Sequence, residues 1–156
     1  MSLVGKPLPP FTLQDDRGET VTPGTLAGAW TVLYAYPKDN TSGCTAEACG
    51  FRDAWARVQA AGARVYGVSR DSLKSHQGFI AKQGLPFRLL SDPDAALLKP
   101  LGAFGKKVMC GRACEGIIRA TFLVDPEGVV RHVWPKVSVK GHVDEVLAVL
   151  EKLKAS

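Results

Sequence analysis

The stretch that decides the interpretation of this chain is Tyr36-Pro37-Lys38-Asp39-Asn40-Thr41-Ser42-Gly43-Cys44-Thr45-Ala46-Glu47-Ala48-Cys49-Gly50-Phe51-Arg52-Asp53. It follows an apolar run, Trp30 to Tyr36, that is typical of a buried strand. The chain then breaks at Pro37 and enters a helical pattern from about Ser42 onward. Cys44 is therefore expected in the first turn of a helix, just past the C-terminal end of a strand. In open α/β sheets, functional sites collect at this position.

The start of that helix favours a reactive form of Cys44. The first N–H groups of a helix have no partner within the helix, and the helix dipole is positive there. Both effects stabilise a thiolate relative to a thiol, and the thiolate is the form that attacks electrophiles. The sequence therefore predicts a nucleophile at Cys44 in preference to a small buried hydrophobic residue.

The rest of the pattern predicts an α/β fold with a mixed central sheet flanked by helices. An N-terminal β-hairpin pairs residues 11–13 with residues 20–21, and a helical turn follows at 23–27. Further strands are expected at 30–36, 64–69, 87–90, 117–124 and 129–134, and helices at 42–61, 73–83, 95–101 and 141–154. Residues 102–115 are expected to form an exposed loop that contains at most one helical turn.

Length and composition restrict the class of protein. A chain of 156 residues that is 46% hydrophobic and 22% charged predicts one globular domain over residues 1–156. No run approaches the roughly 20 apolar residues of a membrane span, and residues 1–7 lack an apolar signal segment, so a cytoplasmic protein is expected. The net charge of +5 comes from scattered basic residues, which does not favour nucleic-acid binding. Four cysteines without an export signal indicate catalysis or metal binding.

These residues resemble the peroxiredoxins, and most closely the Q-type group, also called bacterioferritin comigratory proteins. The family signature Pro-x-x-x-Thr-x-x-Cys is met by Pro37, Thr41 and Cys44. The likeness extends to residues 116–125 and 133–142 and covers essentially the whole chain. The chain departs from the family in two features. Serine stands at position 42 in place of the usual proline, and two further cysteines stand at positions 110 and 114.

The resemblance implies a thioredoxin-like fold and a thiol peroxidase that serves antioxidant defence and redox homeostasis. Cys44 would be the peroxidatic nucleophile, attacking hydrogen peroxide or an alkyl hydroperoxide and becoming a sulfenic acid. The Thr41 hydroxyl would hydrogen-bond both the thiolate and the peroxide, and Pro37 would shield the sulfur from water. No metal, haem or flavin is implied.

Two charged residues complete the expected site. Arg119 stands in an otherwise apolar segment, and the resemblance implies that it stabilises the thiolate and polarises the peroxide O–O bond. Glu47 lies one turn past the nucleophile. It is expected either to stabilise the first helical turn or to orient Arg52 or another polar neighbour.

Cys49 is expected to be the resolving thiol of an intramolecular Cys44–Cys49 disulfide. Five helical residues rise about 7.5 Å, so the two Cα atoms lie roughly 8 to 9 Å apart, whereas a disulfide needs less than about 7 Å. The first turns of the helix must therefore unwind after oxidation. The resemblance implies that thioredoxin then restores both thiols by exchange. The chain lacks the C-terminal arm of dimeric relatives, so a monomer is expected.

Cys110 and Cys114 leave three possibilities open. They are inert thiols, or they form a second or relay disulfide, or one of them is an alternative resolving partner for Cys44. A helical turn would hold their Cα atoms about 6 Å apart, within disulfide range, and an extended segment about 13 Å apart. The expectation is that only Cys49 is essential for resolution.

Two other classes of protein compete with this interpretation. Four thiols could hold a structural zinc ion, but that leaves the Pro-x-x-x-Thr-x-x-Cys context without a purpose. A protein thiol–disulfide oxidoreductase would be expected to carry Cys-x-x-Cys after the strand, and this chain does not. The three histidines are far apart in the sequence and are expected at the surface.

Overall fold

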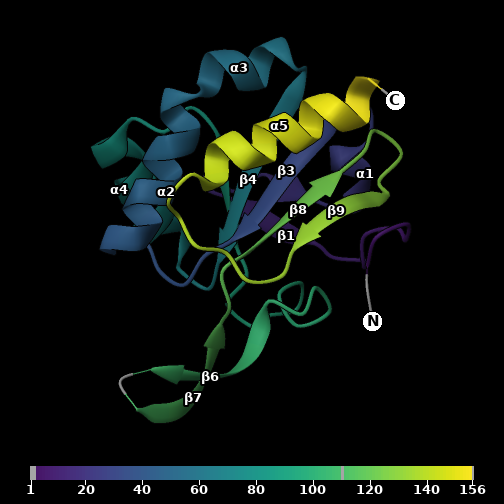
Figure 1. The fold of residues 1–156 in the computed structure, drawn as a ribbon. Coiled ribbons are helices and arrows are strands. Elements are labelled where there is room, and N and C mark those ends of the chain that lie inside the picture. The colour runs from purple at the N-terminus through teal and green to yellow at the C-terminus, as the bar shows by residue number, and fades with distance from the viewer. Residues whose placement is uncertain (1–2, 110, 156) are drawn as a thin grey trace.

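The computed structural model describes residues 3–109 and 111–155. Figure 1 shows helices packed against a twisted sheet, with a separate hairpin standing off from it. The elements in chain order are β1 Leu13–Asp15, β2 Thr20–Val21, α1 Pro23–Leu26, β3 Trp30–Ala35, α2 Ser42–Asp53, α3 Trp55–Ala60, β4 Ala63–Ser69, α4 Leu73–Gln83, β5 Arg88–Ser91, β6 Phe104–Met109, β7 Arg112–Ile117, β8 Ala120–Val124, β9 Val130–Trp134 and α5 His142–Ala155.

The central sheet is mixed, as the sequence predicts. Among the described residues it has seven strands in the order β2-β1-β5-β4-β3-β8-β9. Strands β3, β4 and β5 are parallel, whereas β8 and β9 on one side and β1 and β2 on the other are antiparallel to their neighbours. The hairpin of β1 and β2 at the edge confirms a hairpin near the N-terminus, although its first strand is Leu13–Asp15 rather than residues 11–13. Strand β3, the strand that leads to Cys44, lies inside the sheet between β4 and β8.

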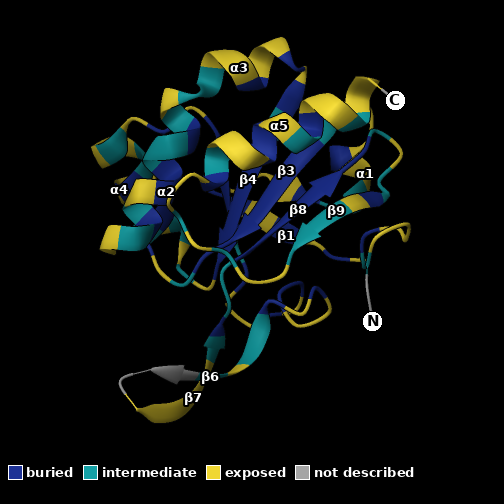
Figure 2. Ribbon diagram, in the orientation of Figure 1, coloured by how far each residue is buried: buried dark blue, intermediate teal, exposed yellow. Residues whose placement is uncertain are grey.

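The central strands of this sheet are buried (Figure 2), and a cluster of apolar side chains lies on each of its faces. Strand β3 contributes to both because its side chains alternate: Val32 and Tyr34 point to one cluster, and Leu33 and Ala35 to the other. The first cluster is covered by α2, α3, α4 and α5, and the second by α1, the N-terminal segment and residues 95–103. Burial on both faces explains why β3 is an uninterrupted apolar run.

The predicted helix over 42–61 is wrong in its length, because the structure divides it into α2 and α3 at Ala54. Ala54 ends the first helix and begins the second, and its N–H is shared between the carbonyls of Gly50 and Arg52. Phe51 on one side of the break stacks on Tyr34, with ring centroids 5.1 Å apart. No glycine or proline marks the break, so tertiary packing overrides local helix propensity here.

The predicted helix over 95–101 is also wrong, because this segment is a series of turns. The buried carboxylate of Asp92 accepts hydrogen bonds from the N–H groups of Ala96, Leu97 and Leu98 at 2.8 to 2.9 Å. Ala95 has a left-handed φ of 55°. A side chain thus supplies acceptors that would otherwise come from a regular helix, and it holds Leu97 and Leu98 in the core.

The expected loop over 102–115 is instead a β-hairpin, with β6 and β7 paired from Phe104↔Ile117 to Met109↔Arg112. Gly111 in its turn has a φ of 77°, which glycine adopts without strain. The predicted strand over 117–124 is correspondingly shorter, because β7 ends at Ile117 and β8 begins at Ala120. Arg119 therefore lies in a two-residue connection rather than inside a strand.

No helix within residues 3–109 and 111–155 is both long enough and apolar enough to cross a bilayer.

Candidate active site

Cys44 lies in the first turn of α2, and its side chain is buried with 1% of its surface exposed. Its Sγ lies 3.3 Å from Nη2 of Arg119, a residue 75 positions further along the chain. Asn40 reverses the chain just before α2 with a left-handed φ of 65°, and Thr41 is the N-cap residue. The buried sulfur of Cys44 therefore lies at the N-terminus of α2 and next to the guanidinium of Arg119. Positive charge at either position attracts a negatively charged sulfur.

Arg119 is held between Cys44 and Glu47. Its Nη1 donates to Glu47 Oε1 at 2.7 Å, and the Arg119 side chain is half-buried. Gly43 leaves room for this arrangement, since a Cβ at that position would lie 3.1 Å from Arg119 Nη2. The backbone carbonyl of Arg119 accepts from the N–H of Val137 at 2.9 Å, which fixes the connection that carries the guanidinium.

Burial acts strongly on Glu47, whose side chain is completely buried. Loss of hydration raises the pKa of Glu47 from 4.5 to about 7, against the opposing effect of Arg119. Burial lowers the pKa of Arg119, but the negative charges of Glu47 and Cys44 outweigh it, so the pKa of Arg119 is raised and the side chain stays cationic. Within the described residues, Glu47 Oε2 is buried without a hydrogen-bond partner, which adds to the cost of ionisation.

The sequence left the partner of Glu47 open between Arg52 and another polar neighbour, and the structure gives Arg119. Pro37 and Arg119 line a common cavity. The Thr41 hydroxyl donates to the carbonyl of Lys38 at 2.9 Å and does not cap α2, so it is exposed at the helix start.

A cavity of about 600 Å³ lies beside Pro37 and Arg119. Its other lining residues are three lysines and three aliphatic side chains: Lys106, Lys107, Lys136, Ile117, Ile118 and Val137. The opening therefore combines cationic and apolar surface next to the guanidinium.

Cys49 and Cys114, the other described cysteines, take no part in the contacts among Cys44, Arg119 and Glu47. Cys49 is on the same helix as Cys44 and is half-buried, and its thiol donates to Oε1 of Gln83 at 3.5 Å. Cys114 is exposed on β7, opposite Lys107. Cys110 lies outside the described residues, so its pairing with Cys114 or with Cys44 stays a prediction. The three described cysteines are free and belong to no cluster of ligand atoms close enough to share a metal ion.

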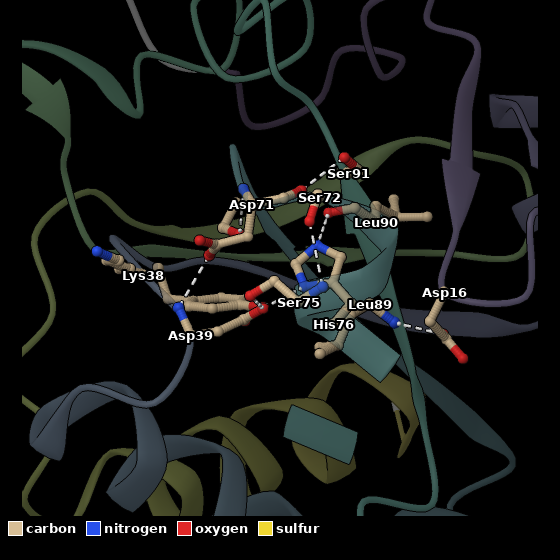
Figure 3. Close-up of polar contacts among 12 residues, drawn as sticks. Asp16, Lys38, Asp39, Asp71, Ser72, Ser75, His76, Leu89, Leu90 and Ser91 are labelled. Atoms are coloured by element: carbon tan, nitrogen blue, oxygen red, sulfur yellow. Dashed lines mark hydrogen bonds and ion pairs between the residues drawn. The ribbon is translucent and has the colours of Figure 1, made fainter. Parts of the chain in front are cut away.

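A buried polar network lies behind the loop that precedes α2 (Figure 3). His76 Nδ1 lies 2.7 Å from Asp39 Oδ2, and its Nε2 lies 2.9 Å from the carbonyl of Leu90. Tyr36 donates to the other Asp39 oxygen at 2.5 Å, and Asp71 accepts from the Asp39 N–H at 2.8 Å. The network ties the loop to α4 and to the ends of β4 and β5.

This network corrects the expectation that His76 lies at the surface, since the side chain is fully buried. Asp39, Asp71 and His76 are close enough to share a cation. However, the carbonyl of Leu90 can only accept, so Nε2 carries a proton, and Nδ1 faces Asp39. Both ring nitrogens have hydrogen-bond partners within the protein, and in this structure the group anchors the loop that precedes α2.

His142 is likewise buried, contrary to the expectation, and its Nε2 lies 2.8 Å from the Thr121 hydroxyl. Burial and the nearby charge of Arg119 lower the pKa of His142, although Glu145 opposes them. Both histidines lie at helical spacing from core residues, His76 three before Phe79 and His142 four before Val146. That spacing is the signal that could have identified them as buried.

A buried cysteine at a helix start, paired with an arginine from a distant segment, is the arrangement of a thiol peroxidase. The comparison with known families agrees: the AhpC/TSA family model matches residues 4–133, and the chain belongs to this family.

Individual relatives point to a narrower group within this family. Peroxiredoxin Bcp of Xanthomonas campestris is 48% identical over 86% of this chain and 84% of its own length. Peroxiredoxin Bcp of Bacillus subtilis is 42% identical over 96% of each chain. The structure of peroxiredoxin Q from Xanthomonas campestris superposes with a TM-score of 0.86, covering 91% of this chain and 90% of that chain at 46% identity. The predicted thioredoxin-like fold, the Q-type resemblance and the assignment as a thiol peroxidase are confirmed.

Proposed function

We propose that Cys44 is the peroxidatic cysteine of this peroxidase and that it reduces hydrogen peroxide and alkyl hydroperoxides. The observation that carries the proposal is the 3.3 Å contact between Cys44 Sγ and Arg119 Nη2 in a buried helix start. The bacterioferritin comigratory protein of Xanthomonas campestris, a structural neighbour of this chain, has alkyl peroxide reduction activity. The aliphatic lining of the cavity beside Arg119 supports an organic substrate for this chain as well.

In the first step the Cys44 thiolate attacks one peroxide oxygen and the O–O bond breaks. The sulfur gives up two electrons and becomes a sulfenic acid, while the other oxygen leaves as water or an alcohol after taking a proton. Arg119 stabilises the thiolate before attack and the charge on the departing oxygen during it. The Thr41 hydroxyl donates its proton to Lys38, so its oxygen is left to accept a hydrogen bond from the O–H of the incoming peroxide, and Pro37 borders the cavity and limits access of water.

Glu47 acts as a positioning residue for Arg119. Its 2.7 Å hydrogen bond fixes the guanidinium in the plane that reaches Cys44. Because burial raises the pKa of Glu47 to about 7, part of the population holds a neutral carboxyl at neutral pH. The neutral form leaves the full positive charge of Arg119 directed at the sulfur.

In the second step Cys49 condenses with the Cys44 sulfenic acid, forming a disulfide and releasing water. Both cysteines lie on the intact helix α2, five residues apart, which corresponds to a Cα separation of roughly 8 to 9 Å. The helix must unwind locally before the sulfurs can bond. A thioredoxin-type dithiol then restores both thiols by exchange. These electron transfers involve only sulfur and oxygen, so turnover needs no metal or organic cofactor.

We further propose that residues 1–156 act as one domain and as a monomer, in a cytoplasm where a dithiol reductant is available. Peroxide consumption in the presence of dithiothreitol tests the central assignment. Cys44→Ser is expected to retain less than a few per cent of wild-type turnover, whereas Cys114→Ser, a matched change at an exposed thiol, keeps it. Normal turnover in Cys44→Ser would remove Cys44 from its role.

A further inference from the structure

Helix α4 contacts both ends of the segment that carries the active-site residues. At its N-terminal end, Ser75 Oγ donates to Asp39 Oδ2 at 2.9 Å and His76 Nδ1 lies 2.7 Å from the same oxygen. Figure 3 shows these two side chains converging on Asp39. The ion-pair partners His76 and Asp39 have side chains that are 0% and 1% exposed. This anchor is buried and has several hydrogen bonds, so it holds the start of the segment firmly.

At the other end of α4, Gln83 contacts two residues of α2. Gln83 is the last residue of the helix and is half-buried. Its side-chain Oε1 accepts from the thiol of Cys49 at 3.5 Å, and its backbone carbonyl accepts from Arg52 Nη1 at 2.7 Å. That carbonyl is one of the last four in α4, which have no partner within their own helix. Arg52 is also paired with exposed Asp53, so this contact lies close to solvent.

The two anchors differ in the strength of their bonds. A thiol is a weak hydrogen-bond donor, and the bond to Gln83 is long. Cys49 must leave Gln83 before it can reach Cys44, because an intact helix keeps the two cysteines too far apart. The anchor at Asp39 need not break in that movement. We therefore expect the contact between Gln83 and α2 to break during this movement, while the contact between α4 and Asp39 stays intact.

We propose that Gln83 is a positioning residue that holds Cys49 in the intact helix and sets the rate at which it reaches the oxidised Cys44. The inference rests on the proposed role of Cys49 as the resolving thiol. The step it controls is the reaction of the Cys44 sulfenic acid with the Cys49 thiol. The Cys49 S–H bond and the Cys44 S–O bond break, the S–S bond forms, and water leaves. A tighter hold on Cys49 prolongs the life of the sulfenic acid and exposes it to a second peroxide.

The test separates the two oxidation phases by stopped-flow tryptophan fluorescence, following the reduced full-length protein after it is mixed with hydrogen peroxide. Gln83→Met keeps the length of the side chain and removes the acceptor, whereas Gln83→Glu keeps an acceptor oxygen. Gln77→Met is the matched control, since Gln77 is an exposed glutamine of the same helix whose amide donates to the carbonyl of Asp16.

The peroxide-independent phase in Gln83→Met is expected to be about twofold faster than in wild type, the low end of what one net hydrogen bond contributes, because the donor is a thiol. The peroxide-dependent phase stays unchanged, and sulfinic acid, measured by mass spectrometry, appears only at higher peroxide concentration. Gln83→Glu, whose charged oxygen is a stronger acceptor for the thiol, is expected to slow this phase, and the Gln77 control keeps the wild-type rate. Arg52→Met removes the other contact to Gln83 and is expected to change the same phase in the same direction.

An unchanged or slower second phase in Gln83→Met overturns the inference, whatever the result for Arg52→Met. A different result would show that Cys49 is not the resolving thiol: the second phase would then persist in Cys49→Ser. If that phase is lost in Cys49→Ser and unaltered in Gln83→Met, Cys49 resolves the sulfenic acid and Gln83 does not control it.

Discussion

Replacing Glu47 by glutamine removes a titrating group from the core of the active site and leaves its shape almost unchanged. The amide oxygen can still accept from Arg119, whose Nη1 donates to the carboxylate of Glu47 at 2.7 Å in the wild-type protein. The new amide nitrogen takes the position of Oε2, which is buried without a partner among the described residues. That nitrogen costs about 1–3 kcal/mol as an unsatisfied donor, and this cost does not depend on pH.

The pH dependence of the free energy of unfolding separates the effect of the Glu47 charge from the pH-independent cost of the amide. A rise in the pKa of Glu47 from 4.5 to about 7 corresponds to about 3 kcal/mol. Because the folded-state pKa lies above the unfolded one, this contribution to stability is fully present below about pH 4.5 and is lost as the pH rises through about 7. The free energy of unfolding of wild type therefore falls relative to that of Glu47→Gln over this range, by up to about 3 kcal/mol.

Urea unfolding of both proteins at pH 5, 6, 7 and 8 measures the difference. Glu151→Gln is the control, since Glu151 is an exposed glutamate paired with Arg57 at 4.0 Å and its removal changes stability little at any pH. A difference between wild type and Glu47→Gln that stays constant with pH would show that burial does not govern Glu47. A variant that becomes progressively less stable as the pH rises would show that the ion pair with Arg119 outweighs the loss of hydration.

Three further predictions concern the reaction and the helix. Arg119→Met is expected to slow the peroxide step, because the variant loses the cation that lies 3.3 Å from the attacking sulfur; an unchanged rate in stopped-flow kinetics would argue against the contact. Oxidation to the disulfide is expected to reduce hydrogen-exchange protection over residues 41–51, and equal protection in both forms would contradict local unwinding. Gly50→Ala is expected to destabilise by about 1–2 kcal/mol, since its Cβ would lie 2.9 Å from Val143 Cγ2, whereas Gly78→Ala, with open space around it, gains up to about 1 kcal/mol; equal effects in thermal unfolding would refute the close approach.

The sequence predicted the position of Cys44 correctly because that position depends on local structure alone. The strand, the break at Pro37 and the helix start at Ser42 follow from local patterns, and they position Cys44 correctly. The predicted partner Arg119 came from the resemblance to a family, because no local pattern relates two residues 75 positions apart. The pairing of Arg119 with Glu47 was open for the same reason.

The features that were wrong depend on tertiary contacts. Residues 102–115 have the glycines of a loop, yet they pair as a hairpin, since cross-strand contacts decide β structure more than composition does. His76 was assigned to the surface by residue type, although Asp39 and Leu90 satisfy its polar atoms in the core. The contact of Gln83 with Cys49 joins α4 to α2 and has no counterpart in the local sequence of either helix.

The most direct test of the account is the disulfide that forms when the fully reduced protein reacts with one equivalent of hydrogen peroxide. Acid quenching, proteolysis without reductant and mass spectrometry identify the linked peptides. The account predicts a Cys44–Cys49 disulfide, and the same linkage in a Cys110→Ser/Cys114→Ser double variant that keeps most of its thioredoxin-dependent turnover. A disulfide from Cys44 to Cys110 or Cys114, together with loss of turnover in the double variant, would contradict it.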